Sequence, residues 1–382
     1  MSVESPTDLS DLEKPPADIT GQPDAVAVAP NWKLVWWRFK KNRLALLGGA
    51  VLIVIILMGL LPGFFSTQDP NDSNSRGSFR PPQTIQLWDN GPALFVFDAT
   101  GSRNSRTLRM EWKIDENRKI PLALFGRGYE WRVFGLIPST LHLLVPADPK
   151  SAGNIHLLGT DRLGRDQWSR LLFGTQVSLS IGLFAVFLST IIGIVLGGIS
   201  GYFGGITDMV IQRVIELLQS IPPIPIWLAL SAALPRTWSV TTTYLAITAI
   251  LALITWTTLA REVRGRFLVL REEDFVVAAK LAGCSQMRIV LRHMVPSMSS
   301  HIIAAVTLAI PVMIINETFL SFLGLGMRPP AISWGVMLAE AQNLQSVALA
   351  PWLLLPSLAV IITVLALNLV GDGLRDAADP YH

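Results

Sequence analysis

The sequence contains little charge, a single cysteine and no phosphate-binding loop. Charged residues make up 15% of the 382 positions and hydrophobic residues 51%, a balance outside that of ordinary soluble domains. Cys284 is the lone cysteine, which excludes an intrachain disulfide. No G-x-x-x-x-G-K-S/T stretch is present to hold nucleotide phosphates, so we do not expect this chain to hydrolyse ATP.

The basic residues do not form a nucleic-acid-binding patch, and the histidines are scattered along the chain. The net charge is only +3, and no basic patch with interleaved aromatic residues occurs, which argues against nucleic acid as a partner. The five histidines show no metal-ligand spacing, so we expect neither a metal site nor a cofactor in this chain. A membrane-embedded enzyme would need clustered His, Asp or Glu and is not favoured.

Long apolar runs are the dominant feature of the sequence. A bilayer core of about 30 Å needs roughly 20 apolar residues in a helix. Six runs approach that length, at 44–61, 177–200, 209–234, 244–260, 302–323 and 352–370. The third is the least hydrophobic, because it carries Arg213 and Glu216 and is interrupted by three prolines. We interpret it as a kinked span, and predict an all-α polytopic membrane protein with six transmembrane helices.

Lysine and arginine gather in two short segments, which sets the expected orientation. One segment, 33–43, precedes the first run, and the other, 261–292, lies between the fourth and fifth runs. The positive-inside rule places both in the cytoplasm, and six spans then place both termini there. The short segments that would face outward carry only Arg236 and Arg328 as basic residues.

Four regions are expected along the chain. Residues 1–30 have the composition of a disordered cytoplasmic tail. Residues 31–62 hold the first span and, before it, apolar residues at helical spacing, either an interfacial helix or an extra cytoplasmic turn of that span. Those apolar residues are Trp32, Val35, Trp36 and Phe39. Residues 63–160 form an extracytoplasmic insertion, and 161–382 form the transmembrane domain with a cytoplasmic loop at 261–298.

The insertion has the composition of a small β-containing lobe. Short runs rich in β-branched and aromatic residues predict antiparallel strands at 84–88, 93–97, 107–114 and 130–134. Trp88, Tyr129 and Trp131 are either core residues of the lobe or contacts for a ligand, and we favour the core role.

Two features inside the predicted bundle stand out. Gly193, Gly197 and Gly201 repeat at four-residue spacing, which allows another helix to approach closely. Glu317, with Asn316 beside it, lies inside the fifth run, where a charge must be paired, protonated or near water. Asn316 and Glu317 are candidates for the translocation path or outer gate, whereas the glycines indicate helix packing. A glutamate held by hydrogen bonds at a helix contact is an equally good interpretation.

The loop between the fourth and fifth runs predicts two short helices that dock on another protein. Residues Phe275, Ala278, Ala279 and Ala282 form a narrow apolar face at helical spacing. Gly283 ends that helix, Ser285 is a suitable N-cap for the next, and Pro296 suits the first turn of the following span. The alternative, a solvated basic loop, does not need such a face.

The loop also carries a family resemblance. The stretch Asp274-Phe-Val-Val-Ala-Ala-Lys-Leu-Ala-Gly283, followed by Ile289, Arg292-His293 and Pro296, resembles the coupling loop of permease subunits of binding-protein-dependent ABC importers. More narrowly, it is similar to the C-type subunit of dipeptide/oligopeptide permeases. Other segments that resemble this subgroup are His156-Leu-Leu-Gly-Thr-Asp161, Gly164-Arg-Asp166 with Ser169-Arg170, Ser321-Phe-Leu-Gly-Leu-Gly326, Pro329-Pro330 with Ser333-Trp-Gly335, and Gly371-Asp-Gly-Leu-Arg-Asp376.

The resemblance implies a set of partners and sites. It implies a bacterial inner-membrane subunit that pairs with a second homologous permease subunit, two ATP-binding subunits holding ATP and Mg, and an extracytoplasmic substrate-binding protein. The implied ATPase-coupling residues are Glu273, Asp274, Phe275, Ala278, Ala279, Ala282, Gly283, Arg288, His293 and Pro296, and Asp166 is a further candidate for the pathway or gate.

Two departures from the family pattern and one rival function bear on this interpretation. Val277 stands where the signature has Glu, and the insertion is longer than the subgroup leads us to expect. The rival is an ion-coupled secondary transporter, which requires inverted repeats and paired ionisable residues at the midplane that Glu317 alone does not supply. The solute, whether peptide, oligosaccharide, opine or nickel, is left open.

Overall fold

The structure is a computed structural model that describes residues 31–89, 91–106, 110–133, 135–148, 151 and 153–378. The expected disordered tail at 1–30 lies outside these residues.

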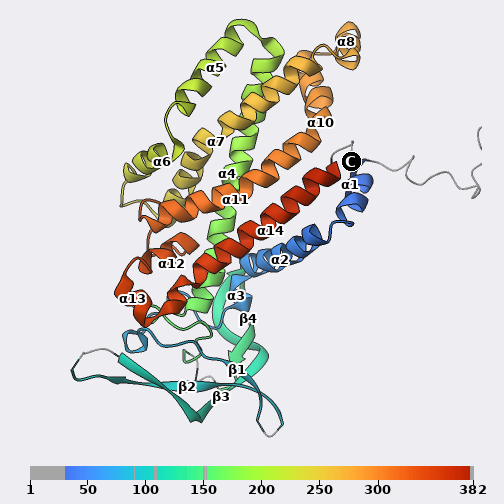
Figure 1. The fold of residues 1–382 in the computed structure, drawn as a ribbon. Helices are drawn as coiled ribbons and strands as arrows, with labels where there is room; N and C mark the ends of the chain where they lie inside the picture. The colour runs from blue at the N-terminus through green and yellow to red at the C-terminus, as the bar shows by residue number, and fades with distance from the viewer. Residues whose placement is uncertain are drawn as a thin grey trace, which may run out of the picture.

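A bundle of long helices stands on a small twisted sheet (Figure 1). The helices are α1 (Asn31–Phe39), α2 (Arg43–Leu60), α3 (Pro62–Phe65), α4 (Gln167–Phe203), α5 (Gly205–Gln219), α6 (Pro223–Ala232), α7 (Val240–Leu270), α8 (Asp274–Leu281), α9 (Gln286–Ile289), α10 (Val295–Ser297), α11 (Ser299–Phe322), α12 (Trp334–Glu340), α13 (Leu344–Leu349) and α14 (Leu355–Ala378).

Five helical segments are long and apolar enough to cross a bilayer: α2, α4, α7, α11 and the segment Pro351–Ala377 that includes most of α14. Each covers one of the predicted runs. Helix α4 packs along α7, and α11 and α14 complete the bundle, with Ile181, Leu251 and Met313 fully buried in its main core. Apolar side chains on the opposite faces are exposed, as a bilayer or a partner helix requires.

The third predicted span is not one kinked helix. It forms two helices, α5 and α6, whose axes differ by 82°. Helix α5 ends at Gln219, and Pro222 has an extended backbone with φ −55° and ψ 135° before α6 begins. Because Pro222 and Pro223 lack an N–H, they cannot continue the hydrogen-bond ladder of α5. Several prolines together therefore break the helix, where a single one would bend it.

Helix α1 is a separate element and not an additional turn of α2. The chain leaves the helix after Phe39, and Asn42 caps α2 by accepting hydrogen bonds from the N–H groups of Leu44 and Ala45, each at 3.1 Å. Val35 and Phe39 pack against Leu374 and Ala377 of α14. The first helix thus lies against the last one, at the end of the bundle opposite the sheet (Figure 1).

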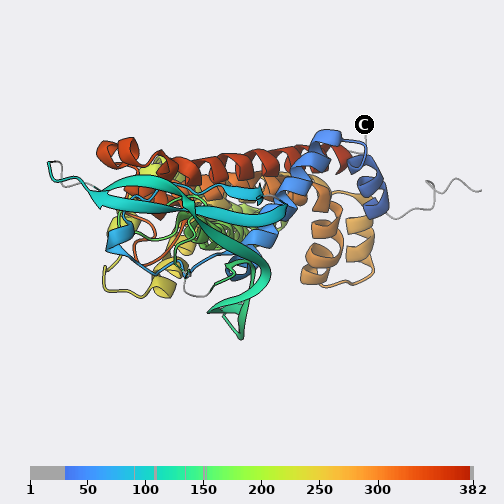
Figure 2. The same cartoon turned by 90° about the horizontal axis from the view of Figure 1, so that it is seen from below.

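The insertion forms one antiparallel sheet with the order β1-β2-β3-β4. Its strands are β1 (Ile85–Trp88), β2 (Pro92–Arg103), β3 (Met110–Val133) and β4 (Ile137–Pro146). The first half of β3 pairs with β2 and the second half with β4. Two expectations are corrected here. The strands predicted at 107–114 and 130–134 are, in their described residues, parts of the single strand β3, and β4 was not predicted. Figure 2 shows the sheet passing beneath the helices.

The three aromatic residues of the lobe differ in burial. Trp131 is 8% exposed and its ring lies over Gly63, so it belongs to the core, whereas Trp88 is 71% exposed and does not. Tyr129 is half-buried and its hydroxyl contacts Ser66, and burial raises the pKa of Tyr129 to about 12. The expected core role therefore fails for Trp88. Both ring nitrogens of His142 lie near carbonyl oxygens, of Ser66 and Tyr129, which joins the sheet to the end of α3.

Candidate functional site

The loop predicted to dock forms a protruding helical pair at the end of the bundle away from the sheet (Figure 1). Helix α8 follows Glu273 and ends at Leu281, and Gly283 turns the chain just beyond it with a φ of +76°, which is readily adopted only by glycine. Ser285 is the N-cap of α9, as expected, although its side chain makes no capping bond. Pro296 lies in the short helix α10, one residue before the break that precedes α11.

The face of α8 that was predicted to dock is exposed at three of its four positions, and another residue anchors the helix. Val276 is fully buried against Phe267 and Ile289, and Ala279 packs at the edge of the same cluster. Phe275, Ala278 and Ala282 are exposed, as a docking surface requires, and only Ala279 of the predicted face turns toward the core. A helical pattern alone does not say which of two apolar stripes meets the bundle.

The exposed part of this loop is strongly apolar. Leu281 is 85% exposed, and Phe275, Val277, Met287 and Leu291 are also largely exposed. We call these five residues the docking face. The remaining predicted coupling residues lie around it, with Glu273, Asp274, Arg288 and Pro296 exposed and His293 half-buried. Sequence reasoning missed Leu281, Met287 and Leu291, although their hydrophobicity in a charged loop was a usable signal.

Glu317 lies at a junction of three segments and is fully buried. Ser178 of α4 and Ser321 of α11 donate hydrogen bonds to its carboxylate, at 3.0 and 2.7 Å. The same two hydroxyls accept bonds from the backbone N–H groups of Trp334 and Met327, at 3.1 and 2.9 Å. Glu317 therefore holds the connection between α11 and α12 in place. Asn316 beside it is half-buried.

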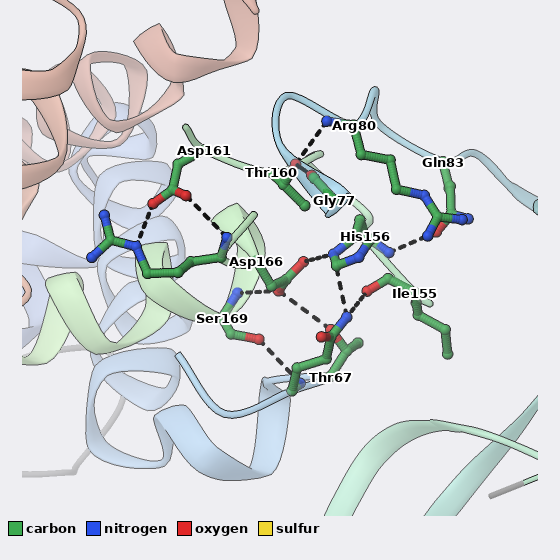
Figure 3. A network of polar contacts seen from close by, with 12 residues as sticks. Thr67, Gly77, Arg80, Gln83, Ile155, His156, Thr160, Asp161, Asp166 and Ser169 are labelled. Atoms are coloured by element: carbon green, nitrogen blue, oxygen red, sulfur yellow. Dashed lines mark hydrogen bonds and ion pairs between the residues drawn. The ribbon is translucent and has the colours of Figure 1, made fainter. Parts of the chain in front are cut away.

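Asp166 belongs to a buried polar junction between the sheet lobe and α4 (Figure 3). Its carboxylate caps α4 by accepting from the N–H of Ser169 at 2.8 Å, and it lies 3.1 Å from Nδ1 of His156. Thr160 bridges two further segments, since its hydroxyl donates to the carbonyl of Gly77 and accepts from the N–H of Arg80. The side chain of Asp166 has no exposed surface. In this structure Asp166 is thus a structural cap.

Asp161 extends the same junction toward α12. It accepts from the backbone and the guanidinium of Arg165, which also pairs with Glu340. Burial and the charge of Asp161 raise the pKa of Glu340, against the opposing charge of Arg165. Gly164 packs so closely on Asn74 that a Cβ would fall 1.9 Å from its carbonyl oxygen, so only glycine fits. The segments 156–161 and 164–170 therefore fix the lobe to the bundle.

The predicted glycine stripe lies where α4 meets α7. A Cβ added to Gly193 would lie 3.1 Å from the carbonyl oxygen of Trp256, and one added to Gly197 would lie 2.4 Å from that of Ala260. A Cβ on Gly201 would lie 2.6 Å from Cβ of Phe267. Within the described residues, no group of three His, Cys, Asp or Glu side chains is arranged to hold a metal ion.

Comparison with known proteins gives two family matches. The profile of the "binding-protein-dependent transport system inner membrane component" matches residues 193–381. The profile of the "N-terminal TM domain of oligopeptide transport permease C" matches residues 31–82. The first covers the glycine stripe, the docking face and Glu317, and the second covers α1 to α3.

Individual relatives agree with these matches. The oligopeptide transport system permease protein OppC of Bacillus subtilis (strain 168) is 29% identical over 91% of this chain and 89% of its own length. The glutathione transport system permease protein GsiD of Pectobacterium atrosepticum is 41% identical over 61% of this chain and 74% of its own. Among solved structures, the inward-facing MetNI methionine ABC transporter aligns with a TM-score of 0.42 at 17% identity, covering 56% of this chain and 97% of that one. This chain belongs to the family of inner-membrane permease components of binding-protein-dependent transport systems.

Proposed function

We propose that this chain forms half of the translocation pathway of an ATP-driven importer for peptides or a related small solute. Its relatives OppC and GsiD are named for oligopeptide and glutathione transport, which supports a peptide-like solute. The other half of the pathway comes from a second homologous permease subunit. Two ATP-binding subunits supply ATP hydrolysis with Mg, and an extracytoplasmic binding protein delivers the solute.

The docking face is the single observation that carries this proposal. Five large apolar side chains are exposed on a helical pair too short to cross a bilayer. The adjacent Glu272, Glu273 and Asp274 are exposed too, and such a row of carboxylates is excluded from the hydrocarbon core. Several large apolar side chains exposed outside the bilayer indicate a site for another protein. An ATP-binding subunit bound to the docking face transmits its movement to the membrane helices through α8 and α9.

The membrane topology follows from treating α5 and α6 as one broken span. The connection after α6 and the connection after α11 line a common pocket, so these two connections lie at the same end of the bundle. This end also carries the sheet lobe (Figure 1). We infer six crossings, with the lobe extracytoplasmic and both termini, together with α8, in the cytoplasm.

A pair of equally exposed leucines provides the test. Leu281 of the docking face and Leu344 of α13 are both 85% exposed but lie at opposite ends of the molecule. Leu281→Asp should remove the ATP-binding subunits from the purified complex, because a carboxylate cannot enter an apolar groove without losing its hydration. Leu344→Asp should leave them bound. Co-purification and ATP-dependent uptake are measured for both variants. Normal assembly of Leu281→Asp, or transport insensitive to ATP depletion, contradicts the proposal.

A further inference from the structure

A small pocket lies between the connection that joins α6 to α7 and the connection that joins α11 to α12. Its volume is about 120 Å³. Arg236 lines it from the first connection and Arg328 from the second. These are the only two basic residues in the short segments that face outward in the proposed topology. The fold thus brings together two positive charges that lie 92 residues apart (328 minus 236).

The positive charge of this pocket is not neutralised within the described part of the chain. Neither guanidinium forms an ion pair with a described residue, and none of the residues that line the pocket is acidic. Nε of Arg328 donates to the carbonyl oxygen of Gly324 at 2.8 Å. Each guanidinium carries five N–H donors, so most of these donors have no acceptor in the described chain.

Ser231 adds a third donor from the end of α6. Its side chain is fully buried and lines the pocket, and its hydroxyl has no hydrogen-bond partner among the described residues. A buried hydroxyl without a partner is destabilising, so an acceptor that enters the pocket would gain a hydrogen bond from it. The first turn of α7 also borders the pocket through Val240 and Thr243, and the positive end of a helix dipole favours an anion.

The far wall of the pocket is held by the Glu317 junction. Met327 lines the pocket, and its N–H is bonded to the Ser321 hydroxyl that donates to Glu317. Arg328 follows directly in the chain. The carboxylate of Glu317 therefore does not line the pocket. It positions the segment that carries Arg328, one of the two arginines of the pocket.

We propose that this pocket, which we name the outer arginine pocket, binds the carboxylate of the imported solute at the extracytoplasmic end of the pathway. The assignment to an imported solute rests on the proposed function. The volume suits a carboxylate with a few attached atoms, and guanidinium groups are suited to planar carboxylates. A peptide always carries one α-carboxylate at its C-terminus, whatever its side chains are. The pocket therefore holds peptides without reading their sequence.

Direct binding of a minimal carboxylate tests the pocket independently of transport. The assembled complex is placed in phosphatidylcholine nanodiscs, and contacts to N-acetylalanine and to N-acetylalanine amide are measured by saturation-transfer NMR. The acid should bind and the amide should not. The double variant Arg236→Gln/Arg328→Gln should weaken binding of the acid at least about tenfold, the ratio that corresponds to about 1.4 kcal/mol. Ser231→Ala should weaken it at least about tenfold, as expected for the loss of one hydrogen bond to a charged carboxylate.

Arg76→Gln is the matched control, because Arg76 is an exposed arginine that does not line the pocket. Equal binding of acid and amide, or equal loss in Arg76→Gln and in the double variant, overturns the proposal. A second series of nanodiscs contains phosphatidylglycerol. If this lipid displaces N-acetylalanine, and the double variant binds the lipid more weakly than the wild type does, the pocket binds a lipid headgroup and the proposal is overturned. ATP-driven uptake of a tripeptide mixture by the wild-type complex is measured in parallel. If the acid binds as expected and no peptide is imported, the proposed function fails and the carboxylate pocket stands.

Discussion

At the scale of single residues, Glu317 shows how a charge inside a membrane helix is accommodated. Two serine hydroxyls donate to its carboxylate, and each hydroxyl also accepts from a backbone N–H of the α11–α12 connection. The sequence alone indicated that Glu317 must be paired, protonated or near water. It did not indicate Ser178, which lies 139 residues away, because such a contact exists only once α4 and α11 are packed.

Replacing Glu317 with Gln should destabilise the protein and leave coupling to ATP hydrolysis intact. An amide offers one acceptor oxygen where the carboxylate offers two, so one serine hydroxyl loses its acceptor at a cost of about 1 to 3 kcal/mol. We expect a lower thermal midpoint of the purified complex and normal stimulation of ATPase activity by solute. Ser321→Ala should lower the midpoint in the same direction, because it removes a donor to the same carboxylate. An unchanged midpoint together with lost stimulation would instead assign Glu317 to the transport step.

At the scale of secondary structure, the lengths of elements were more predictable than their partners. Each long span was visible as an apolar run, whereas the 82° bend after α5 depends on where α6 finds a surface to pack on. In the lobe, separate strands were predicted at 107–114 and 130–134, whereas β3 runs without a break through the polar segment 115–119. The segment 115–119 is a register shift within the pairing of β3 with β2, where Asp98 pairs with Asp115 and Phe97 with Lys119, and β3 exchanges β2 for β4 only after Pro121. Alternation within a strand does not reveal such an exchange of neighbours.

Two glycine-to-alanine variants near the contact between α4 and α7 should change the stability of the bundle in opposite directions. Gly197→Ala should destabilise the bundle by about 1 to 3 kcal/mol, because the new methyl group would lie 2.4 Å from a backbone oxygen of α7 that cannot move alone. Gly265→Ala on α7 is the control, since nothing lies within 4 Å of its added Cβ. Because alanine is favoured over glycine within a helix by about 1 kcal/mol, this variant should be neutral or stabilising. Thermal unfolding in detergent compares the two. Equal effects would remove the glycine stripe from the helix contact.

At the scale of the whole molecule, the arrangement has two functional ends. The docking face lies at one end, and the sheet lobe, the polar junction around Asp166 and the outer arginine pocket lie at the other. Helices α4, α7, α11 and α14 run between them. In the proposed function, a movement of α8 that follows ATP binding would reach the outer pocket through α7 and α11, whose connections both line it.

The single cysteine makes this two-ended arrangement directly testable. Cys284→Ser gives a background without cysteine, into which Thr237→Cys is introduced beside Arg236 and, separately, Met287→Cys on the docking face. Thr237 and Met287 are both exposed, so neither position is hidden by the fold. If α5 and α6 together cross the membrane once, a membrane-impermeant maleimide should label the Thr237→Cys variant in intact cells. It should label the Met287→Cys variant only after the membrane is opened.

The opposite labelling result would contradict the proposed topology. A re-entrant α5–α6 pair would return the connection before α7 to the cytoplasmic side, and the thiol of the Thr237→Cys variant would then be protected in intact cells. That result would leave five crossings and would place the outer arginine pocket on the wrong side to meet an incoming solute. Both arginines would then require a new assignment, because a pocket that opens to the cytoplasm can only meet a solute that has already been imported.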